Sequence, residues 1–257
     1  MKGKSPSITN KLWSCSAVLA ILLFWQVITG TGMIDAFLLP SPLQVIKAFI
    51  TEFPTLMEHS VITLSEAFVG LGLGIFLGFL MAVAMDQFEP LYQALYPLVI
   101  LTQTVPTVAI APLLVLWFGY EMTPKVILIV ITTFFPITIG LLTGFRSSDP
   151  DAVSLLRAMG AGKRQIFFYI KLPGAMDPFF SGLRISASYA VVGAVISEWL
   201  GGFGGLGVYM TRVKKAFSFD KMFAVILLIS IISLILMNGV EILQWLFMPW
   251  KRIKNDK

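Results

Sequence analysis

The sequence predicts an all-α polytopic membrane protein with six transmembrane helices, and three observations support this prediction. The 257 residues are 57% hydrophobic and only 13% charged, whereas soluble domains carry about 25% charged residues. Several apolar runs reach the roughly 20 residues that a helix needs to cross a bilayer. These runs are continuously apolar, so they lack the alternation expected of membrane strands. Because six spans leave little chain for anything else, we expect residues 1–257 to form one membrane domain.

Hydropathy places the six spans at residues 12–30, 61–85, 91–118, 124–145, 179–200 and 221–248. An even number of spans puts both termini on one side of the membrane. Thirteen of the 19 lysines and arginines then lie on the side of the termini, and six lie on the other. Since cytoplasmic loops are enriched in these residues, we expect both termini in the cytoplasm. A basic cluster on the opposite side, from Arg212 to Lys221, argues against this orientation.

A short helix is predicted between the first two spans, in FLLPSPLQVIKAFITEF. Pro40 and Pro42 break the chain at the membrane edge. Apolar residues then recur at helical spacing, at Leu43, Ile46, Phe49, Ile50 and Phe53. This pattern is typical of an amphipathic helix that lies at the membrane interface.

Small residues recur every fourth position in two spans. The second span carries Gly70, Gly74 and Gly78, and the fifth carries Gly182, Ser186, Ala190 and Ala194. Such ridges let helices approach closely in lipid. The packing they predict can lie within one subunit or between two.

Proline and polar residues interrupt the third span. Pro97, Pro106 and Pro112 fall within it, and polar side chains cluster around Pro106, at Thr102, Gln103, Thr104 and Thr107. A broken backbone at membrane depth is tolerated where it lines a cavity or is buried in protein. We therefore predict that Thr102, Gln103, Thr104, Pro106 and Thr107 line a translocation path. The alternative is a proline kink whose threonine hydroxyls satisfy the freed carbonyls.

The largest predicted cytoplasmic loop, residues 146–178, contains a helix start signal. Ser148 or Asp149 can cap the helix, with Pro150 at its first position. Gly160 and Gly162 end it. Its apolar face is made by Ala152, Leu155, Leu156 and Met159. An exposed apolar stripe marks a partner surface, although the helix could also pack under the membrane bundle.

Several signals that suggest enzymes fail on inspection. GAGK at 160–163 lacks the Ser or Thr and the first glycine of a phosphate loop, and GFGGLG at 202–207 follows a membrane helix and not a strand. His59 is the single histidine of the chain, which excludes an HExxH zinc site. Glu66, Glu198 and Arg184 fall near span ends, where they could snorkel, and together with Glu241 they form no clear proton relay. We expect no catalysis, cofactor, metal or nucleic-acid binding.

The stretch GAGKRQIFFYIKLP resembles the cytoplasmic signature of the permease subunits of binding-protein-dependent ABC importers. That signature reads EAA, three residues, Gly, nine residues, then Ile-x-Leu-Pro. Gly160, Ile170, Leu172 and Pro173 stand at the matching positions. The EAA positions fall on Ser154, Leu155 and Leu156, so the acidic residue is missing.

Four further stretches resemble the subgroup that handles nitrate, sulfonates, taurine and thiamine-pyrimidine precursors. They are LPSP at 39–42, VPTVAIAPLLVLWFG at 105–119, LPGAMDPFFSGLR at 172–184 and SEWLGGFGGLG at 197–207. Together with the cytoplasmic signature they make five stretches in order, and the resemblance covers nearly the whole chain.

The resemblance implies a type I importer, MetI-like permease fold in a bacterial cell (inner, or plasma) membrane. It also implies a second copy of the chain, two ATP-binding cassette ATPase subunits and an external solute-binding protein as partners, with membrane lipid around them. ATP hydrolysis would occur in the partner subunit. The residues that would couple to the ATPase are Ala152, Leu155, Leu156, Arg157, Met159, Gly160, Lys163, Leu172 and Pro173. The solute would be small, and anionic or heterocyclic.

Two other classes remain as alternatives. An ion-coupled secondary transporter would need buried carboxylates at mid-span, and the sequence shows no clear set of them. A membrane-embedded hydrolase would have to rely on His59 beside Ser60. Neither alternative accounts for the cytoplasmic signature.

Overall fold

The computed structural model describes residues 8–32, 34–35 and 37–250, and every regular element in these ranges is helical. Prolines and glycines set most of the boundaries, as the first turn of α2 at Pro42 and the turn after α5 at Gly119 illustrate. The elements are α1 (Ile8–Gly30), α2 (Pro42–Thr51), α3 (Phe53–Gln87), α4 (Glu89–Thr102), α5 (Thr107–Phe118), α6 (Met122–Arg146), α7 (Pro150–Ala158), α8 (Lys163–Ile166), the π-helical turn η1 (Phe167–Lys171), α9 (Leu172–Trp199), α10 (Leu206–Lys215) and α11 (Phe219–Phe247).

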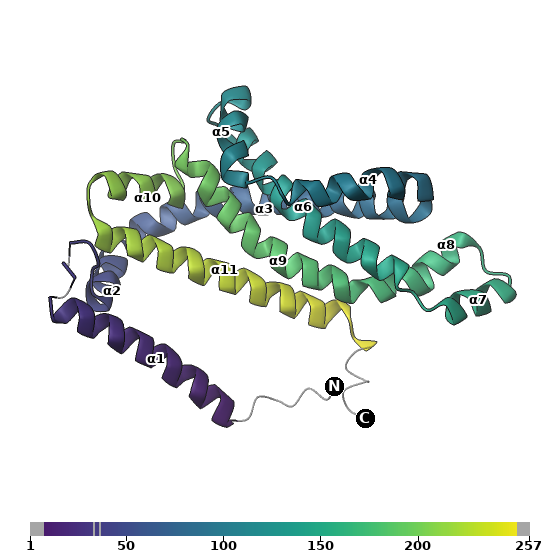
Figure 1. The fold of residues 1–257 in the computed structure, drawn as a ribbon, viewed down its shortest axis with the longest axis horizontal. Coiled ribbons are helices and arrows are strands. Elements are labelled where there is room, and N and C mark those ends of the chain that lie inside the picture. Colours follow the sequence, from purple (N-terminus) through teal and green to yellow (C-terminus); the bar gives the residue numbers. More distant parts are fainter. Residues whose placement is uncertain (1–7, 33, 36, 251–257) are drawn as a thin grey trace.

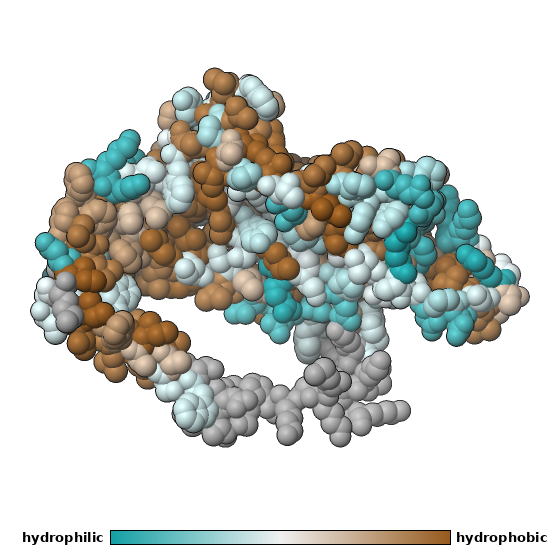
Figure 2. Space-filling model, viewed as in Figure 1, coloured by the Kyte–Doolittle hydropathy of each residue, from teal (hydrophilic) through white to brown (hydrophobic). Residues whose placement is uncertain are grey.

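Four long helical segments run lengthwise through the molecule: α3, α6, α9 with the turns before it, and α11 (Figure 1). Each is long and apolar enough to cross a membrane. Helices α7 and α8 lie at one end, and α2 and α10 lie at the other. Following the predicted orientation, we call these the inner and outer ends. Hydrophobic side chains cover the flanks, and hydrophilic ones gather near α7 and α8 and near α10 (Figure 2).

The predicted span at 91–118 is a pair of helices, α4 and α5, bent by 97° at residues 103–106. Its two ends lie at opposite ends of the bundle. Glu89 at the start of α4 forms an ion pair of 2.6 Å with Arg146 at the inner end of α6. Tyr120, just after α5, lies against Gly201 at the outer end of α9. The pair is therefore one broken span and not a loop that returns to the side it came from.

The small-residue ridges pack within one chain. Gly70, Gly74 and Gly78 of α3 face Ile129, Thr133 and Ile137 of α6, so these two helices run parallel. On the other flank of α6, the Ser186 hydroxyl of α9 donates to the Thr133 carbonyl at 2.9 Å. Helices α3, α6 and α9 thus form the centre of the fold.

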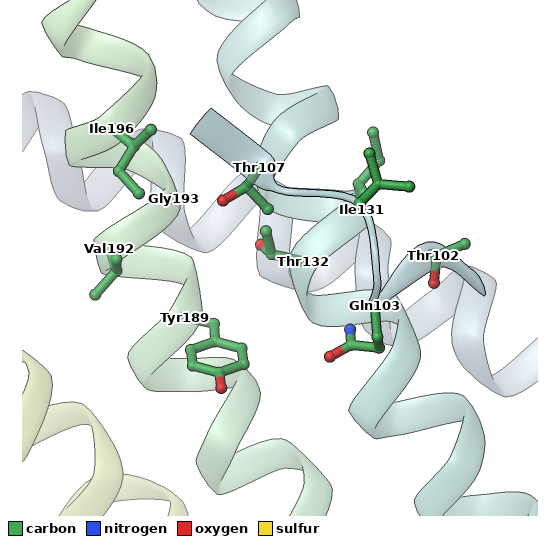
Figure 3. A pocket seen from close by; sticks show the side chains of 10 residues that line it. Thr102, Gln103, Thr107, Ile131, Thr132, Tyr189, Val192, Gly193 and Ile196 are labelled. Atoms are coloured by element: carbon green, nitrogen blue, oxygen red, sulfur yellow. The ribbon is translucent and has the colours of Figure 1, made fainter. Parts of the chain in front are cut away.

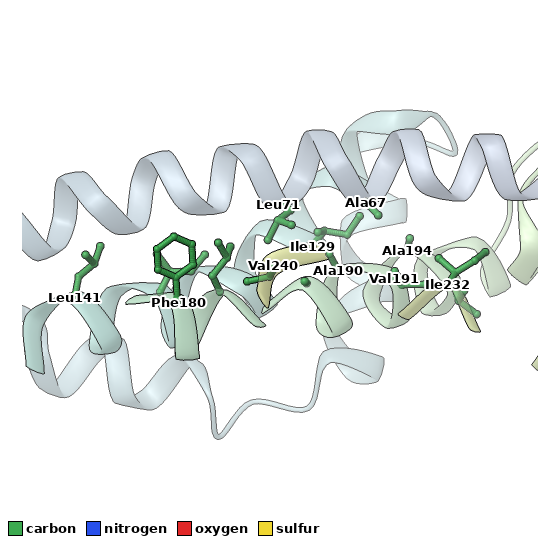
Figure 4. Close-up of a cluster of buried hydrophobic side chains, with 14 of the residues drawn as sticks. Ala67, Leu71, Ile129, Leu141, Phe180, Ala190, Val191, Ala194, Ile232 and Val240 are labelled. Atoms are coloured by element: carbon green, nitrogen blue, oxygen red, sulfur yellow. The ribbon is translucent and has the colours of Figure 1, made fainter. Parts of the chain in front are cut away.

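The hydrophobic core lies along these contacts and extends to α11. Side chains from α3, α6, α9 and α11 meet in it (Figure 4). Ile129, Leu141, Ala190 and Val191 are fully buried. Apolar faces that remain exposed on α4, α5 and α11 suit contact with lipid or with another membrane subunit.

Three predicted boundaries are corrected by the structure. The second span begins at Phe53 and not near residue 61, because Pro54 starts the helix directly after α2. Phe53 therefore belongs to α3 and not to the amphipathic helix, which ends at Thr51. The fifth span is already helical from Leu172, and through η1 and α8 from Lys163, instead of beginning at 179.

The number of spans agrees with the prediction for the last five. The first predicted span falls on α1, which touches the rest mainly through α2 and stands apart in Figure 1. The apolar part of α1 whose side chains are described, Ser16–Gly30, is shorter than a full crossing. Six spans therefore remain a prediction. The predicted cytoplasmic termini, at residues 1–7 and 251–257, lie outside the described residues.

Candidate solute path and coupling surface

A cavity of about 170 Å³ opens where the broken span bends (Figure 3). The segment around the break forms one wall, and α6 and α9 form the others. The residues that line it are Thr102, Gln103, Val105, Thr107, Ile131, Thr132, Tyr189, Val192, Gly193 and Ile196. A larger, more open hollow lies further out, between the end of α5 and Leu200.

The cavity lies near the middle of α6, a helix long enough to cross a bilayer. Thr132 is ten residues from the start of α6 and fourteen from its end, or about 15 and 21 Å at 1.5 Å per residue. A bilayer core is about 30 Å thick. A solute that occupies this cavity would therefore be halfway across.

Two kinds of polar group line the cavity. The hydroxyls of Thr102 and Thr132 donate to the carbonyls of Val99 and Ile129, at 2.7 and 2.8 Å. Within the described part of the chain, by contrast, the side chains of Gln103, Thr107 and Tyr189 have no hydrogen-bond partner. Figure 3 shows the Gln103 amide turned toward the side of α9, with Tyr189 on that opposite wall. These three groups are available to a solute.

Of the five predicted path residues, Thr102, Gln103 and Thr107 line the cavity, and Thr104 and Pro106 do not. The Thr104 hydroxyl donates to the Leu101 carbonyl at 2.8 Å, as the alternative kink interpretation expected, and Pro106 precedes α5. The sequence interpretation missed Thr132 and Tyr189. Both are polar side chains inside otherwise apolar spans, which is the signal that could have identified them.

Helix α7 protrudes at the inner end (Figure 1). The Asp149 carboxylate caps it by accepting from the Asp151 N–H at 2.9 Å, and Pro150 follows in its first turn. None of its residues is buried, and Leu155 and Met159 are 61% and 77% exposed. The alternative that this helix packs under the bundle is therefore not what the structure shows. Its apolar stripe is free for a partner.

The turn after α7 depends on a glycine. Gly160 has φ +84°, a left-handed conformation that glycine adopts at little cost. Its N–H donates to the Arg157 carbonyl, and the N–H of Ala161 donates to the Leu156 carbonyl. The chain reverses here toward α8.

The other predicted coupling residues divide into two groups. Arg157 and Lys163 line a hollow of about 160 Å³ together with Asp86 and Lys171, whose ion pair measures 2.7 Å. Leu172 and Pro173 are partly buried in the first turn of α9, directly after η1, and are not on the α7 surface. These two residues join the predicted coupling segment to the rest of α9.

A buried polar cluster at the outer end corrects the view that Glu66 and Glu198 reach toward the membrane surface. Glu198 is 1% exposed; its carboxylate accepts from the Thr63 hydroxyl at 2.8 Å and from the Gly207 N–H at 2.6 Å. Glu66 is 4% exposed and pairs with Lys125. Neither side chain snorkels, since each has a protein partner.

The glycine-rich stretch 201–207 closes over this cluster. The Gly205 N–H donates to Nδ1 of His59 at 3.0 Å, and the Leu206 N–H donates to Thr63 Oγ1 at 2.8 Å. A Cβ atom at Gly205 or Gly207 would overlap the Glu198 side chain. The glycines here let the backbone wrap a carboxylate.

Comparisons with known proteins agree with this geometry. Residues 74–249 match the family described as binding-protein-dependent transport system inner membrane component. The formylaminopyrimidine transport permease protein ThiX of Halalkalibacterium halodurans is 36% identical over 91% of this chain and 94% of its own. The taurine transport system permease protein TauC of Escherichia coli is 27% identical over 97% and 94%. A structure of the MetNI methionine ABC transporter, in inward-facing conformations, aligns with TM-score 0.59 and 18% identity, over 74% of this chain and 92% of that one.

Proposed function

The chain belongs to the family of binding-protein-dependent transport system inner membrane components, and from that premise we propose how it serves as the permease subunit of an ATP-driven importer. It is a multi-pass membrane protein with the MetI-like permease fold. The chain provides the route through the membrane, while ATP is hydrolysed elsewhere. The family favours this function over an ion-coupled transporter.

The solute route passes the cavity at the break between α4 and α5. The broken backbone, the central depth and the unpaired side chains of Gln103 and Tyr189 support this assignment. Relatives are named for formylaminopyrimidine, taurine, aliphatic sulfonates and riboflavin. A small anionic or heterocyclic solute, delivered by an external binding protein, is consistent with those names.

Helix α7 is the contact for the ATPase. The observation that carries this proposal is a capped helix without a buried residue, whose exposed Leu155 and Met159 form an apolar stripe at the inner end. Ala152, Leu156 and Arg157 lie on the same helix, and Lys163 follows the Gly160 turn. An ATPase groove would bury this stripe and gain about 25 cal/mol per Å² of apolar surface.

Transport would follow from movement of α7 relative to the bundle. Closure of two ATPase subunits on ATP would displace two copies of α7, one from each of two permease chains. The helical continuity from Lys163 through Leu172 and Pro173 to Trp199 passes that displacement to the cavity wall formed by α9. Alternating access then requires the cavity to face the two sides in turn.

The test is purification of the chain from its native membrane in a mild detergent, followed by mass spectrometry. We expect an ATPase in equal amount, together with a second copy of the chain. The variant Leu155→Asp should lose the ATPase while remaining folded, and Ser154→Asp on the same helix should keep it. Recovery of the chain without an ATPase, or equal loss in both variants, would contradict the proposal.

A further inference from the structure

The cavity at the break narrows the class of solute, given the proposed function on which this inference rests. None of its ten lining residues is charged. Taking an ion out of water without a counter-charge costs several kcal/mol. The walls therefore disfavour a solute with a net charge, although relatives are named for the anions nitrate and aliphatic sulfonates.

The backbone at the break adds hydrogen-bond donors. At the end of α4 the carbonyls of Val99, Ile100 and Leu101 already accept hydrogen bonds from residues 102–104. The first N–H groups of α5, at Thr107 and Val108, have no partner among the described residues. These N–H groups suit a solute that carries hydrogen-bond acceptors, such as ring nitrogens.

Two of the unpaired side chains, those of Gln103 and Tyr189, favour a planar ring. A glutamine amide recognises an amine beside a ring nitrogen with two parallel hydrogen bonds, as it does at the edge of adenine. An aromatic ring such as that of Tyr189 offers a stacking face. The cavity volume of about 170 Å³ is close to the roughly 150 Å³ that holds a benzene-sized ring.

We propose that Gln103 and Tyr189 select an uncharged nitrogen heterocycle of one ring, with an amine next to a ring nitrogen, over anionic solutes. Gln103 pairs with the edge of the ring, and Tyr189 contacts its face. The hydroxyls of Thr102 and Thr132 donate hydrogen bonds to backbone carbonyls, so toward a solute they can act as acceptors.

Equilibrium dialysis tests this selection directly. The permease with its ATPase, without the binding protein, is dialysed against radiolabelled formylaminopyrimidine, cytosine, taurine, ethanesulfonate or nitrate. Omission of the binding protein assigns any selectivity to the membrane part. We expect retention of the two pyrimidines and not of the three other probes.

Single substitutions show which residues are responsible for the selectivity. Gln103→Leu should weaken pyrimidine retention about tenfold or more, whereas Gln93→Leu, at an exposed position of α4, should stay within about twofold. Tyr189→Phe keeps the aromatic side chain and should still retain the pyrimidines, whereas Tyr189→Ala should weaken their binding.

Three results would overturn the inference: preferential retention of taurine, ethanesulfonate or nitrate, no retention of either pyrimidine at millimolar concentration, or equal effects at Gln103 and Gln93. Failure of the proposed function is a separate outcome, since it would show as the absence of an ATPase in the purified material. The same dialysis on the chain alone would still test the selection.

Discussion

The ammonium group of Lys125 lies 2.6 Å from the Glu66 carboxylate, and both side chains are almost fully buried. This pair joins α6 to α3 beside the carboxylate of Glu198, within the part of the bundle that the glycine-rich stretch covers. Removing one partner of a buried pair leaves the other charge uncompensated and costs about 3–5 kcal/mol. Substitutions in this pair therefore test whether Glu66 and Lys125 are buried against each other at the outer end of the fold.

Glu66→Gln should lower the thermal unfolding temperature of the purified chain, because Lys125 keeps its charge without a counter-ion. Glu66→Gln combined with Lys125→Met should recover much of the loss. Glu89→Gln, at the half-exposed pair with Arg146, should change little, since exposed pairs contribute little. Similar losses at Glu66 and Glu89 would show that the Lys125 pair is not buried. Unfolding followed by tryptophan fluorescence in detergent measures all three.

The glycine ridge of α3 provides a second test within one helix. A Cβ atom at Gly74 would overlap the Thr133 side chain, whereas one at Gly72 meets nothing within 4 Å. Gly74→Ala should destabilise the fold by about 1–3 kcal/mol through overpacking. Gly72→Ala should be neutral or slightly stabilising, because alanine favours the helix. Equal effects would contradict the close approach of α3 and α6.

The Gly160 turn should control coupling and not folding. A Cβ atom there meets nothing within 4 Å, but the left-handed conformation costs a branched residue about 1–3 kcal/mol. We expect Gly160→Val to keep its expression level and to lose solute uptake in proteoliposomes, while ATP hydrolysis continues. Gly162→Val is the control, because Gly162 has φ −76°. Normal uptake by the Gly160 variant would argue against a coupling role for this turn.

The cap of α7 should matter because the helix has no buried residue to hold it. Asp149→Ala removes the side-chain acceptor for the Asp151 N–H and should cost about 1 kcal/mol of local helix stability. The expected result is weaker retention of the ATPase during purification. Asp149→Ser, which can also cap, should restore it. If Asp149→Ser does not restore retention of the ATPase, the negative charge of Asp149 matters more than its hydrogen bond to the Asp151 N–H.

Acid should loosen the contact between the α2–α3 junction and α11. The hydrogen bond from Lys221 holds the pKa of the Glu52 carboxyl below its ordinary value of 4.5, against the opposing effect of partial burial. A carboxylate with a lowered pKa stabilises the fold fully above its unfolded-state pKa, and this contribution is lost as pH falls through the lower folded value. Unfolding temperatures measured from pH 7 to pH 3 should fall less steeply for Glu52→Gln than for the wild type. Parallel curves would show that Glu52 is not the group responsible.

Much of the fold could be predicted because long apolar runs and small-residue spacing are local signals. The last five spans, the α2 helix and the packing ridges were all visible in this way, and so was the capped helix at Pro150. The 97° bend was not, since Pro106 and its polar neighbours indicate a break but not its angle. The predicted start of the second span was too late. Pro54 lies in the first turn of the helix, but polar residues there precede the apolar run that hydropathy detects.

The candidate sites were predicted less completely, for a physical reason. Thr102, Gln103 and Thr107 stand together in the sequence, whereas Tyr189 reaches the same cavity only through the packing of α9 against α6. Glu66 and Glu198 were misread because position along a span does not reveal a partner on another helix. Lys125 is the partner of Glu66, and the Thr63 hydroxyl and the Gly207 N–H are the partners of Glu198.

The parallel course of α3 and α6 requires the chain to return across the membrane between them, and the broken span makes that return. Few of its residues are buried, and only Val99, Ala111 and Leu114 are among them in the described helices α4 and α5. The segment that we propose meets the solute thus contributes few buried residues to the core. Transplanting residues 102–107 from a relative should therefore change the cargo at little expense in folding free energy, which makes this short stretch the place to re-engineer the importer.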